Sequence, residues 1–526
     1  MLSILLSAIL STQGAQWPLT RAERSNYRET SHYSDVVDFL QELRELGAPI
    51  RIESMGKGSA DLDMPLVIAS RPMMNAQMAR RSGRPIIYIQ ANIHAGEVEG
   101  KEAVLALLRD WSRAKDSPLD HAAFVITPIY NIWGNEQFGP VEKNRPEQDG
   151  PELVGVRPNG QGFDLNRDCI KAESPEMRAV LRYVYQGWDP DVIMDLHTTD
   201  GTRHGFDLTY SPPLNPDTDP EIMRYTRDVL LPDVRKSALK KYGLKLFDYG
   251  NAERREERRD WFTFEPFGRY VTNYAGLRNR VSVLSEATTF IPFKDRIDGT
   301  KEFVSEVVGH VIRDSKKVTE MTRAADLRAS QLGLTGSSTL GVKFDFASRG
   351  SETVPIEKLG LGEKPPLTGR PTAYDQLKME IFDRFKITQA EPVPFAYAFP
   401  SSESEVAGLL QRHGVVVERV DASAPVRASV FQIGSAVEAR QPFQGHKLLR
   451  LEGAFEDRTV RLDEGSFVVR SGQPLGNLIF TMLEPESLDG VSTWGFVKQP
   501  LAVGAPFPIV KLMKPVYLRL TRLPEP

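Results

Sequence analysis

The sequence predicts an α/β domain with a mixed, mainly parallel sheet and helices on both faces, followed by a β-rich α+β domain. The chain has 526 residues, which is long for one core because domains usually contain about 50–250 residues. Strand-like and helix-like segments alternate up to about residue 330, as in an α/β sheet. After a Gly/Ser/Thr linker at residues 331–339, short strand-like runs separated by Gly, Pro, Asp and Ser are typical of antiparallel strands. We therefore expect a first domain at residues 25–330 and a second domain at residues 340–526.

The first residues have the character of an export signal. Residues 1–14 (MLSILLSAILSTQG) are mostly apolar and include small residues at Thr12 and Gly14, although no Lys or Arg precedes the apolar run. A signal peptide over residues 1–15 would make the protein secreted or periplasmic. The run is too short to cross a bilayer, and no other stretch approaches the roughly 20 apolar residues of a transmembrane helix. We therefore expect no stable membrane insertion.

Charge and cysteine content exclude several classes of protein. The chain has 66 basic and 70 acidic residues and a formal net charge of −4, which gives no electrostatic basis for binding nucleic acid. Cys169 is the single cysteine, so an intrachain disulfide and a Cys-rich metal cluster are excluded. A metal site in this chain must use His and carboxylate side chains.

The elements of the first domain follow from hydrophobic periodicity. Apolar, β-branched runs predict buried strands, and apolar residues at i, i+3, i+4 and i+7 predict helices such as the one through Val104 and Trp111. Ser174, Pro175 and Glu176 mark a helix start, with an N-cap, a proline at the first position and an acid at the positive end of the dipole. Predicted strands cover residues 63–70, 86–92, 123–130, 191–197 and 280–287, and further helices cover residues 34–46 and 302–330.

The first candidate metal ligands follow the strand at residues 86–92. His94 and Glu97 lie in the turn between that strand and a helix, and ligands of open α/β sheets bind beyond the carboxyl ends of strands. An imidazole nitrogen and a carboxylate oxygen three residues apart can converge on one Zn²⁺, which accepts both ligand types at about 2 Å. The HxxE pair alone is also compatible with a solvated His and Glu at a helix start.

His197 is the third candidate ligand. It ends the predicted strand at residues 191–197 (DVIMDLH), so it can reach the same edge of the sheet as His94. Taken alone, it would be an ordinary polar residue in a Thr-rich loop. Two His, one Glu and a water are a known ligand set of open, catalytic zinc sites. We therefore expect one Zn²⁺ per chain.

Residues 157–167 (RPNGQGFDLNR) lie between these two motifs. Together, HxxE, RxNxxGxDLNR and the strand-terminal DLH resemble the zinc metallocarboxypeptidases of the carboxypeptidase A type, in which the motifs occur in this order. The resemblance covers about residues 25–325 and points to a bacterial-like, secreted member with a C-terminal accessory domain. It implies a zinc carboxypeptidase-like fold in which His94, Glu97 and His197 bind zinc.

The resemblance also assigns roles to the loop between the motifs. Arg157 matches the arginine that polarises the scissile carbonyl, and Asp164 matches the residue that orients a zinc-bound histidine, a contact that fixes its tautomer. Asn166 and Arg167 match the pair that holds the terminal carboxylate of the substrate, where Arg offers a bidentate fork that Lys lacks. Without the resemblance, the same loop would be a Gly- and Asn-rich turn with a structural Arg–Asp pair.

The family also has a general base and a tyrosine that caps the substrate. Glu286, near the end of the predicted strand at residues 280–287, matches the base, and we expect its apolar surroundings to raise its pKa. A surface ion pair is the structural alternative for Glu286. Tyr274 is the expected capping tyrosine, with Tyr270 as its competitor.

Three features depart from the family pattern. Gly96 stands where many relatives carry an arginine, and residues 131–156 lack the usual Asn-Pro-Asp-Gly turn, reading NIWGNEQF at residues 131–138 instead. Residues 211–261 form a long insertion, and we interpret its charged run at residues 253–260 as a solvated face. The departures concern substrate contacts rather than the metal.

The second domain is predicted to consist mainly of short strands with one helix at residues 405–413. His413 and His446 have no second ligand cluster around them in the sequence, and we interpret both as structural. The predicted strands cover residues 341–346, 393–399, 415–420, 429–433, 447–451, 459–462, 466–469 and 478–482.

The sequence thus predicts an exported zinc metallocarboxypeptidase that hydrolyses C-terminal bonds of peptides with a free C-terminus. The resemblance implies a zinc-activated water, with Glu286 as its general base. Two alternatives stay open. One is another zinc amide hydrolase on this scaffold, such as a deacylase or a cell-wall peptide carboxypeptidase, and the other is a non-catalytic peptide-binding protein.

Overall fold

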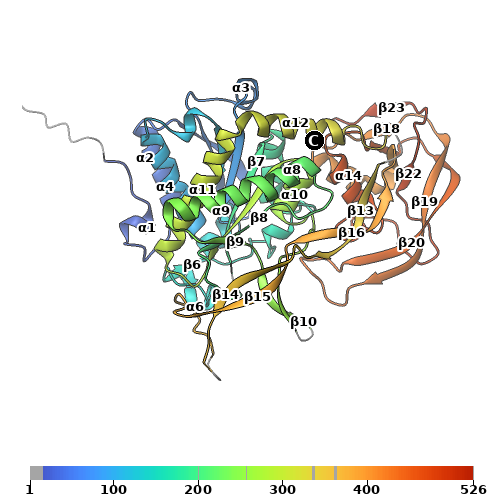
Figure 1. Ribbon diagram of the computed structural model, residues 1–526. Coiled ribbons are helices and arrows are strands. Elements are labelled where there is room, and N and C mark those ends of the chain that lie inside the picture. Colours follow the sequence, from blue (N-terminus) through green and yellow to red (C-terminus); the bar gives the residue numbers. More distant parts are fainter. Residues whose placement is uncertain (1–15, 200, 256–257, 335–337, 361–363, 525–526) are drawn as a thin grey trace, which may run out of the picture.

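The computed structural model describes residues 16–199, 201–255, 258–334, 338–360 and 364–524 (Figure 1). The predicted signal peptide at residues 1–15 lies outside these ranges. Within them, no helix combines the length and the apolar character needed to cross a membrane.

An eight-stranded sheet forms the centre of the first region, and it confirms the predicted mixed, mainly parallel architecture. The four pairings β4–β3, β3–β7, β7–β12 and β8–β9 are parallel, whereas β1–β2, β2–β4 and β12–β8 are antiparallel. In spatial order the strands are β1 (Ile50–Lys57), β2 (Asp63–Ala69), β4 (Ala123–Thr127), β3 (Ile86–Ala91), β7 (Val192–Thr199), β12 (Val281–Thr288), β8 (Leu208–Ser211) and β9 (Leu246–Asp248).

Helices of the first region surround this sheet (Figure 1). They are α1 (Arg21–Arg24), α2 (Tyr33–Glu45), α3 (Ala76–Ser82), α4 (Glu99–Arg113), α5 (Ile132–Glu136), α6 (Val141–Asn144), α7 (Pro175–Val180), α8 (Pro220–Tyr225), α9 (Leu231–Tyr242), α10 (Val271–Leu277), α11 (Phe293–Arg313) and α12 (Ser315–Ala329). The predicted helix at residues 302–330 is therefore two helices, separated at Asp314. The short pair β5 (Gly139–Pro140) and β6 (Leu153–Val154) lies in the segment between α5 and the loop at residues 157–167.

Two helices show that both faces of the sheet are covered. Gly100 of α4 lies against Leu196 of β7, and the hydroxyl of Ser282 in β12 donates to the carbonyl of Thr272 in α10. Leu196 is aligned with Ser285 in the parallel pairing of β7 and β12. Because side chains alternate along a strand, Ser285 and Ser282 point to opposite faces, and so α4 and α10 cover opposite faces.

The C-terminal region contains a seven-stranded sheet in which the strand pairings are antiparallel. Its order is β20 (Leu449–Leu462), β19 (Ala424–Glu438), β22 (Val510–Leu512), β17 (Ala396–Phe399), β21 (Phe467–Arg470), β18 (Glu418–Val420) and β23 (Leu520–Arg522). Helix α13 (Ser404–Arg412) confirms the helix predicted at residues 405–413. The strand predicted at residues 478–482 is wrong, because helix α14 (Gly476–Leu483) occupies it. Every residue of α14 is buried, and a helix that is apolar all round has no distinguishing periodicity.

Long ribbons connect the two regions. Strands β14 (Ser351–Glu357) and β15 (Tyr374–Phe382) extend the hairpin of β10 (Asn251–Arg255) and β11 (Arg258–Phe262) into a four-stranded sheet, and β13 (Thr339–Ala347) pairs with β16 (Arg384–Pro392). Residues assigned by the sequence to the second domain thus pair with the insertion of the first. A single apolar cluster also runs from Val36 of α2 to Ile509 near β22, so the two regions share a continuous core.

Candidate metal centre

The turn after β3 places His94 and Glu97. Asn92 adopts a positive φ of 62°, and its side-chain amide donates to the carbonyls of Ala95 and Glu97. The backbone N–H of Glu97 donates to the carbonyl of His94 at 3.0 Å. Asparagine tolerates this left-handed conformation and can bond to nearby backbone. The local sequence therefore folds the turn so that both side chains are presented beyond the strand end.

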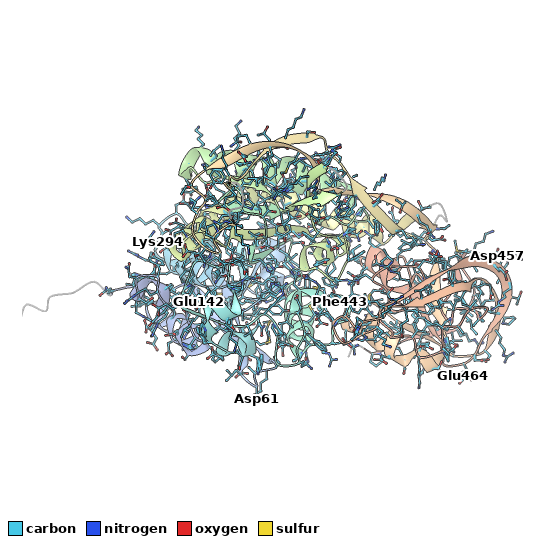
Figure 2. The ribbon with its side chains drawn as sticks, turned by 90° about the horizontal axis from the view of Figure 1, so that it is seen from below. Asp61, Glu142, Lys294, Phe443, Asp457 and Glu464 are labelled. Carbon is cyan, nitrogen blue, oxygen red and sulfur yellow. The ribbon has the colours of Figure 1, made fainter. Side chains whose placement is uncertain are left out.

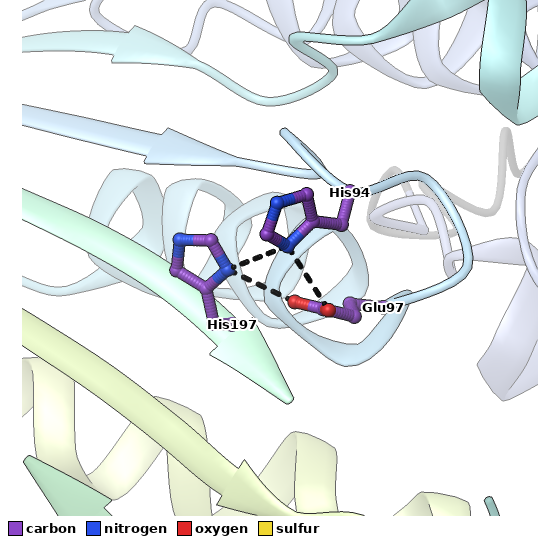
Figure 3. A group of neighbouring side chains, drawn as sticks. All are labelled: His94, Glu97 and His197. Carbon is purple, nitrogen blue, oxygen red and sulfur yellow. Dashed lines mark hydrogen bonds and ion pairs between the residues drawn. The ribbon is translucent and has the colours of Figure 1, made fainter. Parts of the chain in front are cut away.

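The three predicted metal ligands lie together, as Figure 3 shows. Nδ1 of His94 is 3.0 Å from Oε1 of Glu97, and Nδ1 of His197 is 2.9 Å from Oε2 of Glu97. The two Nδ1 atoms are 3.2 Å apart. Each of the three side chains is at most 4% exposed. One ligand atom from each residue therefore points into a small, buried space.

A carboxylate contacts the outer nitrogen of each histidine. Nε2 of His94 is 2.9 Å from Asp164, as the resemblance implied, and Nε2 of His197 is 2.8 Å from Asp195. A carboxylate in such a contact accepts a hydrogen bond, so each Nε2 carries the proton and each Nδ1 directs a lone pair to the centre. Sequence reasoning missed Asp195. The available signal was its position two residues before His197, since alternate residues of a strand share a face.

This donor set fits Zn²⁺. Two imidazole lone pairs and the carboxylate oxygens of Glu97 face one another at about hydrogen-bond distance, and such acceptors repel unless a cation lies between them. His₂Glu is a ligand set of catalytic zinc sites, with a further position left for water or substrate. Among the residues that the structure describes, His94, Glu97 and His197 form the one group of at least three His, Cys, Asp or Glu side chains that could hold a metal ion.

The pKa shifts at the centre have the same electrostatic origin. Burial would raise the pKa of Glu97, but His94 and Arg145 hold it well below its usual range. Burial would lower the pKa of His197, but the carboxylates of Asp195 and Glu97 raise it well above its ordinary value. The carboxylates thus favour a positive charge at this position.

A cavity of about 620 Å³ opens over the ligands. It brings together the ligands and five other predicted residues, namely Arg157, Asp164, Asn166, Arg167 and Glu286. The guanidinium of Arg157 donates from Nε to Asp164 at 2.9 Å and from Nη1 to Glu97 at 3.3 Å. A cavity with convergent charged groups next to a metal site is where a substrate is expected to bind.

The loop at residues 157–167 ends in a short 3₁₀ turn, Leu165–Arg167. Asp164 caps this turn by accepting from the N–H of Asn166 at 2.9 Å, and the side-chain carbonyl of Asn166 accepts from the N–H of Val271 at 3.0 Å. The guanidinium carbon of Arg167 lies 4.5 Å from the centre of the Tyr270 ring, a cation–π contact. These contacts hold Asn166 and Arg167 in the wall of the cavity.

Glu286 reaches the cavity from the neighbouring strand. In the parallel pairing of β12 and β7, Glu286 is aligned with His197, and aligned residues of neighbouring strands project from the same face. Its relative exposure is 9%. The predicted base therefore lies beside a predicted ligand, although it is 89 positions away in the sequence.

Tyr274 differs from its predicted place. It is fully buried, and its hydroxyl bonds to Nδ1 of His413 at 2.7 Å, so it lies in the core at the junction of the two regions. The competitor, Tyr270, lines the cavity, and its hydroxyl donates to Glu265 at 2.9 Å. The reason is that Tyr270 precedes α10, whereas Tyr274 lies on the buried surface of that helix.

Arg145 is a site residue that the sequence did not reveal. Its guanidinium donates to Glu97 at 3.2 Å and to the carbonyl of Thr198 at 3.2 Å. It also explains the departure at Gly96, where a Cβ would lie 2.9 Å from Cγ of Arg145 and 3.0 Å from the carbonyl of Gly155. The side chain of Arg145 thus packs over position 96 and places a positive charge beside Glu97. No local pattern around Arg145 signalled this contact.

The donor set, the carboxylate at Glu286 and the arginines around one cavity define the class of zinc-dependent hydrolases. Comparison with known proteins adds a family likeness. Residues 36–227 match the family model described as zinc carboxypeptidase, a range that includes all three ligands and the loop at residues 157–167 but not β12. This part of the first region therefore resembles a zinc carboxypeptidase domain, and the comparisons support a peptide hydrolase.

Individual relatives are distant. The chain is 23% identical over 453 residues to Carboxypeptidase 2 of Trichophyton rubrum, covering 81% of this chain and 76% of the relative. It is 22% identical to Carboxypeptidase 2 of Trichophyton equinum over 450 residues, with the same shares of both chains. The structure of a metallo-carboxypeptidase from Burkholderia cenocepacia superposes with a TM-score of 0.40 at 16% identity, covering 54% of this chain and 69% of the other.

Proposed function

We propose that this enzyme hydrolyses the C-terminal peptide bond of peptides that carry a free terminal carboxylate. The observation that supports the proposal best is the position of Arg167, which lines the same cavity as the metal ligands and Glu286. A guanidinium can hold a carboxylate through two parallel hydrogen bonds. Such an anchor beside a metal site would select the last residue of a chain over internal residues.

The cavity offers each group that peptide hydrolysis requires. Zn²⁺ held by His94, Glu97 and His197 would act as a Lewis acid that polarises a carbonyl and lowers the pKa of water. Glu286 would accept the proton of the attacking water on a carboxylate oxygen and return it to the leaving amine. Arg157 would donate to the oxyanion as negative charge develops there, a role in which the loss of one donor costs about 10²–10³ in rate.

The proposal is tested by the variant Arg167→Ala on paired substrates. Each peptide is supplied with a free C-terminal acid and with a C-terminal amide. We expect wild type to prefer the free acid, and the variant to lose most of this preference because the charge-assisted contact to the carboxylate is gone. Arg167→Lys is the matched variant, since it keeps the charge but not the fork, and it should retain an intermediate preference.

The readout is the ratio of kcat/KM for free acid over amide, with zinc content and melting temperature measured in parallel. A variant that loses activity equally on both substrates, with zinc still bound, would make Arg167 a structural residue. The enzyme would then act as an endopeptidase or a deacylase.

A further inference from the structure

A tight turn of the C-terminal region reaches the cavity of the first region. It connects β19 to β20, and Phe443 and His446 exchange backbone hydrogen bonds of 2.7 and 3.0 Å across it. The two central residues, Gln444 and Gly445, have φ values of 51° and 82°. Two consecutive positive φ angles are the mark of a type I′ turn, whose twist matches that of a hairpin. The turn therefore holds Phe443 and His446 opposite each other as a hydrogen-bonded pair.

The turn is fixed against the loop that carries Asp164. The side-chain carbonyl of Gln444 accepts from the backbone N–H of Asp164 at 2.8 Å. Nε2 of His446 lies 2.9 and 3.0 Å from the carboxylate oxygens of Glu173. A Cβ on Gly445 would lie 3.5 Å from the ring of Phe163, which is van der Waals contact. Gln444, Gly445 and His446 of the turn thus all lie against the first region.

A second contact fixes the segment that leads to Tyr270. Asp489 accepts from the backbone N–H of Arg269 at 2.6 Å and from its Nε at 2.9 Å. The indole of Trp494 donates to the same carboxylate at 2.8 Å. Arg269 directly precedes the cavity residue Tyr270, and its guanidinium carbon lies 5.5 Å from the centre of the Phe443 ring. The C-terminal region therefore holds the segments that carry both Asp164 and Tyr270.

Phe443 is the apolar side chain that this arrangement exposes. It lines the cavity and is 36% exposed, and Figure 2 shows it where the two regions meet. Phe264 and Tyr249 line the same cavity, as does Tyr270. The cavity thus combines charged groups, namely the metal ligands and the arginines, with aromatic side chains. Exposed aromatic surface in a binding cavity is suited to an apolar side chain of a ligand.

We propose that Phe443 contacts a large apolar side chain of the peptide substrate, so that the C-terminal region forms part of the specificity site. The inference rests on the proposed function, since it requires a peptide substrate. Its physical basis is that the turn holds an aromatic ring over the cavity at a fixed position. Burial of the substrate side chain against this ring would remove apolar surface from water. The selectivity gained would be of the size of other hydrophobic pockets, which discriminate by about 10–200-fold.

The test uses the zinc-loaded, full-length enzyme and two series of N-blocked tripeptides with free C-termini. One series places Ala, Leu or Phe at the last position, and the other places them at the penultimate position. Phe443→Ala should lower kcat/KM about ten- to hundredfold for Phe and Leu in one of the two series. It should leave the all-Ala peptide within about threefold of wild type. Phe443→Leu keeps apolar volume and should give an intermediate ratio of Phe over Ala.

Tyr517→Ala is the matched control, because Tyr517 is a fully exposed aromatic residue of the C-terminal region. It should leave all ratios unchanged. The inference is overturned if Phe443→Ala lowers kcat/KM equally for every peptide, or leaves the ratios of Phe and Leu over Ala at their wild-type values. If the alanine variant does not fold, Phe443→Leu decides by the same ratio. Wild-type turnover of free acids over amides tests the proposed function separately.

Discussion

Two buried histidine sites of this protein have opposite electrostatic surroundings. His197 is 3% exposed and contacts the carboxylates of Asp195 and Glu97, which raise its pKa. His413 is 0% exposed, and burial together with the charge of Arg278 lowers its pKa to about 3. Two histidines of similar burial therefore differ: carboxylates around His197 favour positive charge at its ring, whereas His413 stays neutral.

The hydrogen bonds of His413 explain the difference. Nε2 lies 3.0 Å from the carbonyl of Ile170, which can only accept, so Nε2 carries the proton. Nδ1 then accepts from the hydroxyl of Tyr274 at 2.7 Å. Arg278 donates to that hydroxyl and to the backbone carbonyl of His413. Neutral partners satisfy both ring nitrogens, which agrees with the structural interpretation of His413 and leaves no acceptor for a second ring proton.

The comparison teaches that burial alone does not identify a metal ligand. His94 and His197 differ from His413 because a carboxylate contacts Nε2 of each ring. The carboxylate of Glu97 contacts Nδ1 of both rings. A buried positive charge needs such partners. The following three experiments test this contrast, beginning with the largest expected effect.

The largest effect is expected from loss of the metal. His197→Ala should lose bound zinc and at least about 10³ in kcat/KM, because Lewis-acid catalysis contributes several kcal/mol. A chelator should remove zinc and activity from wild type in the same way. His413→Gln is the control and should keep one zinc per chain. Elemental analysis measures the zinc content of both variants. The assignment of His197 as a ligand and of His413 as a structural residue is contradicted if His197→Ala keeps its zinc or if His413→Gln loses it.

The second effect concerns the proton transfer that the metal site requires. Glu286→Gln keeps the volume of the side chain but cannot accept a proton, so the rate should fall by about 10²–10⁴. Zinc content and melting temperature should stay near wild type, because Glu286 is not among the ligands. A fall of less than tenfold with zinc bound would exclude Glu286 as the base. Glu265, which lines the same cavity, would then be the carboxylate to test.

The smallest effect is on stability and concerns His413. Its pKa is about 3 in the folded state and about 6.5 in the unfolded state, so the unfolded chain binds more protons between these values. Its contribution to stability is therefore complete above about pH 6.5 and is lost as the pH falls, with a slope of about 1.4 kcal/mol per pH unit. His413→Gln removes this term while other titrating groups remain in both proteins.

Denaturant unfolding of both proteins from pH 7 to pH 4 measures the term. At pH 7 the variant should be about 1–3 kcal/mol less stable, because buried partners lose a hydrogen bond, and the gap should narrow toward pH 4. Tyr88→Phe is the control, because it removes a buried hydrogen bond to Thr127 but leaves His413 and its partners intact, so it should keep the acid sensitivity of wild type. A gap that stays constant with pH would mean that His413 is not held neutral by the fold.

The sequence predicted the three candidate metal ligands, and the structure brings them together. His94 and Glu97 belong to one short turn that Asn92 folds locally, and His197 ends a strand parallel to β3. Parallel strands bring their carboxyl ends to one edge, so the three ligands converge once the strands pair. The loop from Arg157 to Arg167 also folds through its own Asp164 cap. Short-range patterns thus predicted where these side chains lie, and the order of the three motifs implied their roles.

The side chains around the cavity follow from long-range packing. The choice between Tyr270 and Tyr274 depended on where α10 begins, because Tyr270 precedes the helix and Tyr274 lies within it, where every residue is buried. Arg145 reaches Glu97 from a loop without a signal of its own, and Gln444 contacts Asp164 across 280 positions of the chain. Such contacts form when whole helices and strands pack over a shared core. The sequence near Arg145 or Gln444 contains no hydrophobic periodicity or turn residue that predicts the contacting residue. The turn and the strand ends that carry the metal ligands have short-range sequence signals, whereas the surface that would meet the substrate has none.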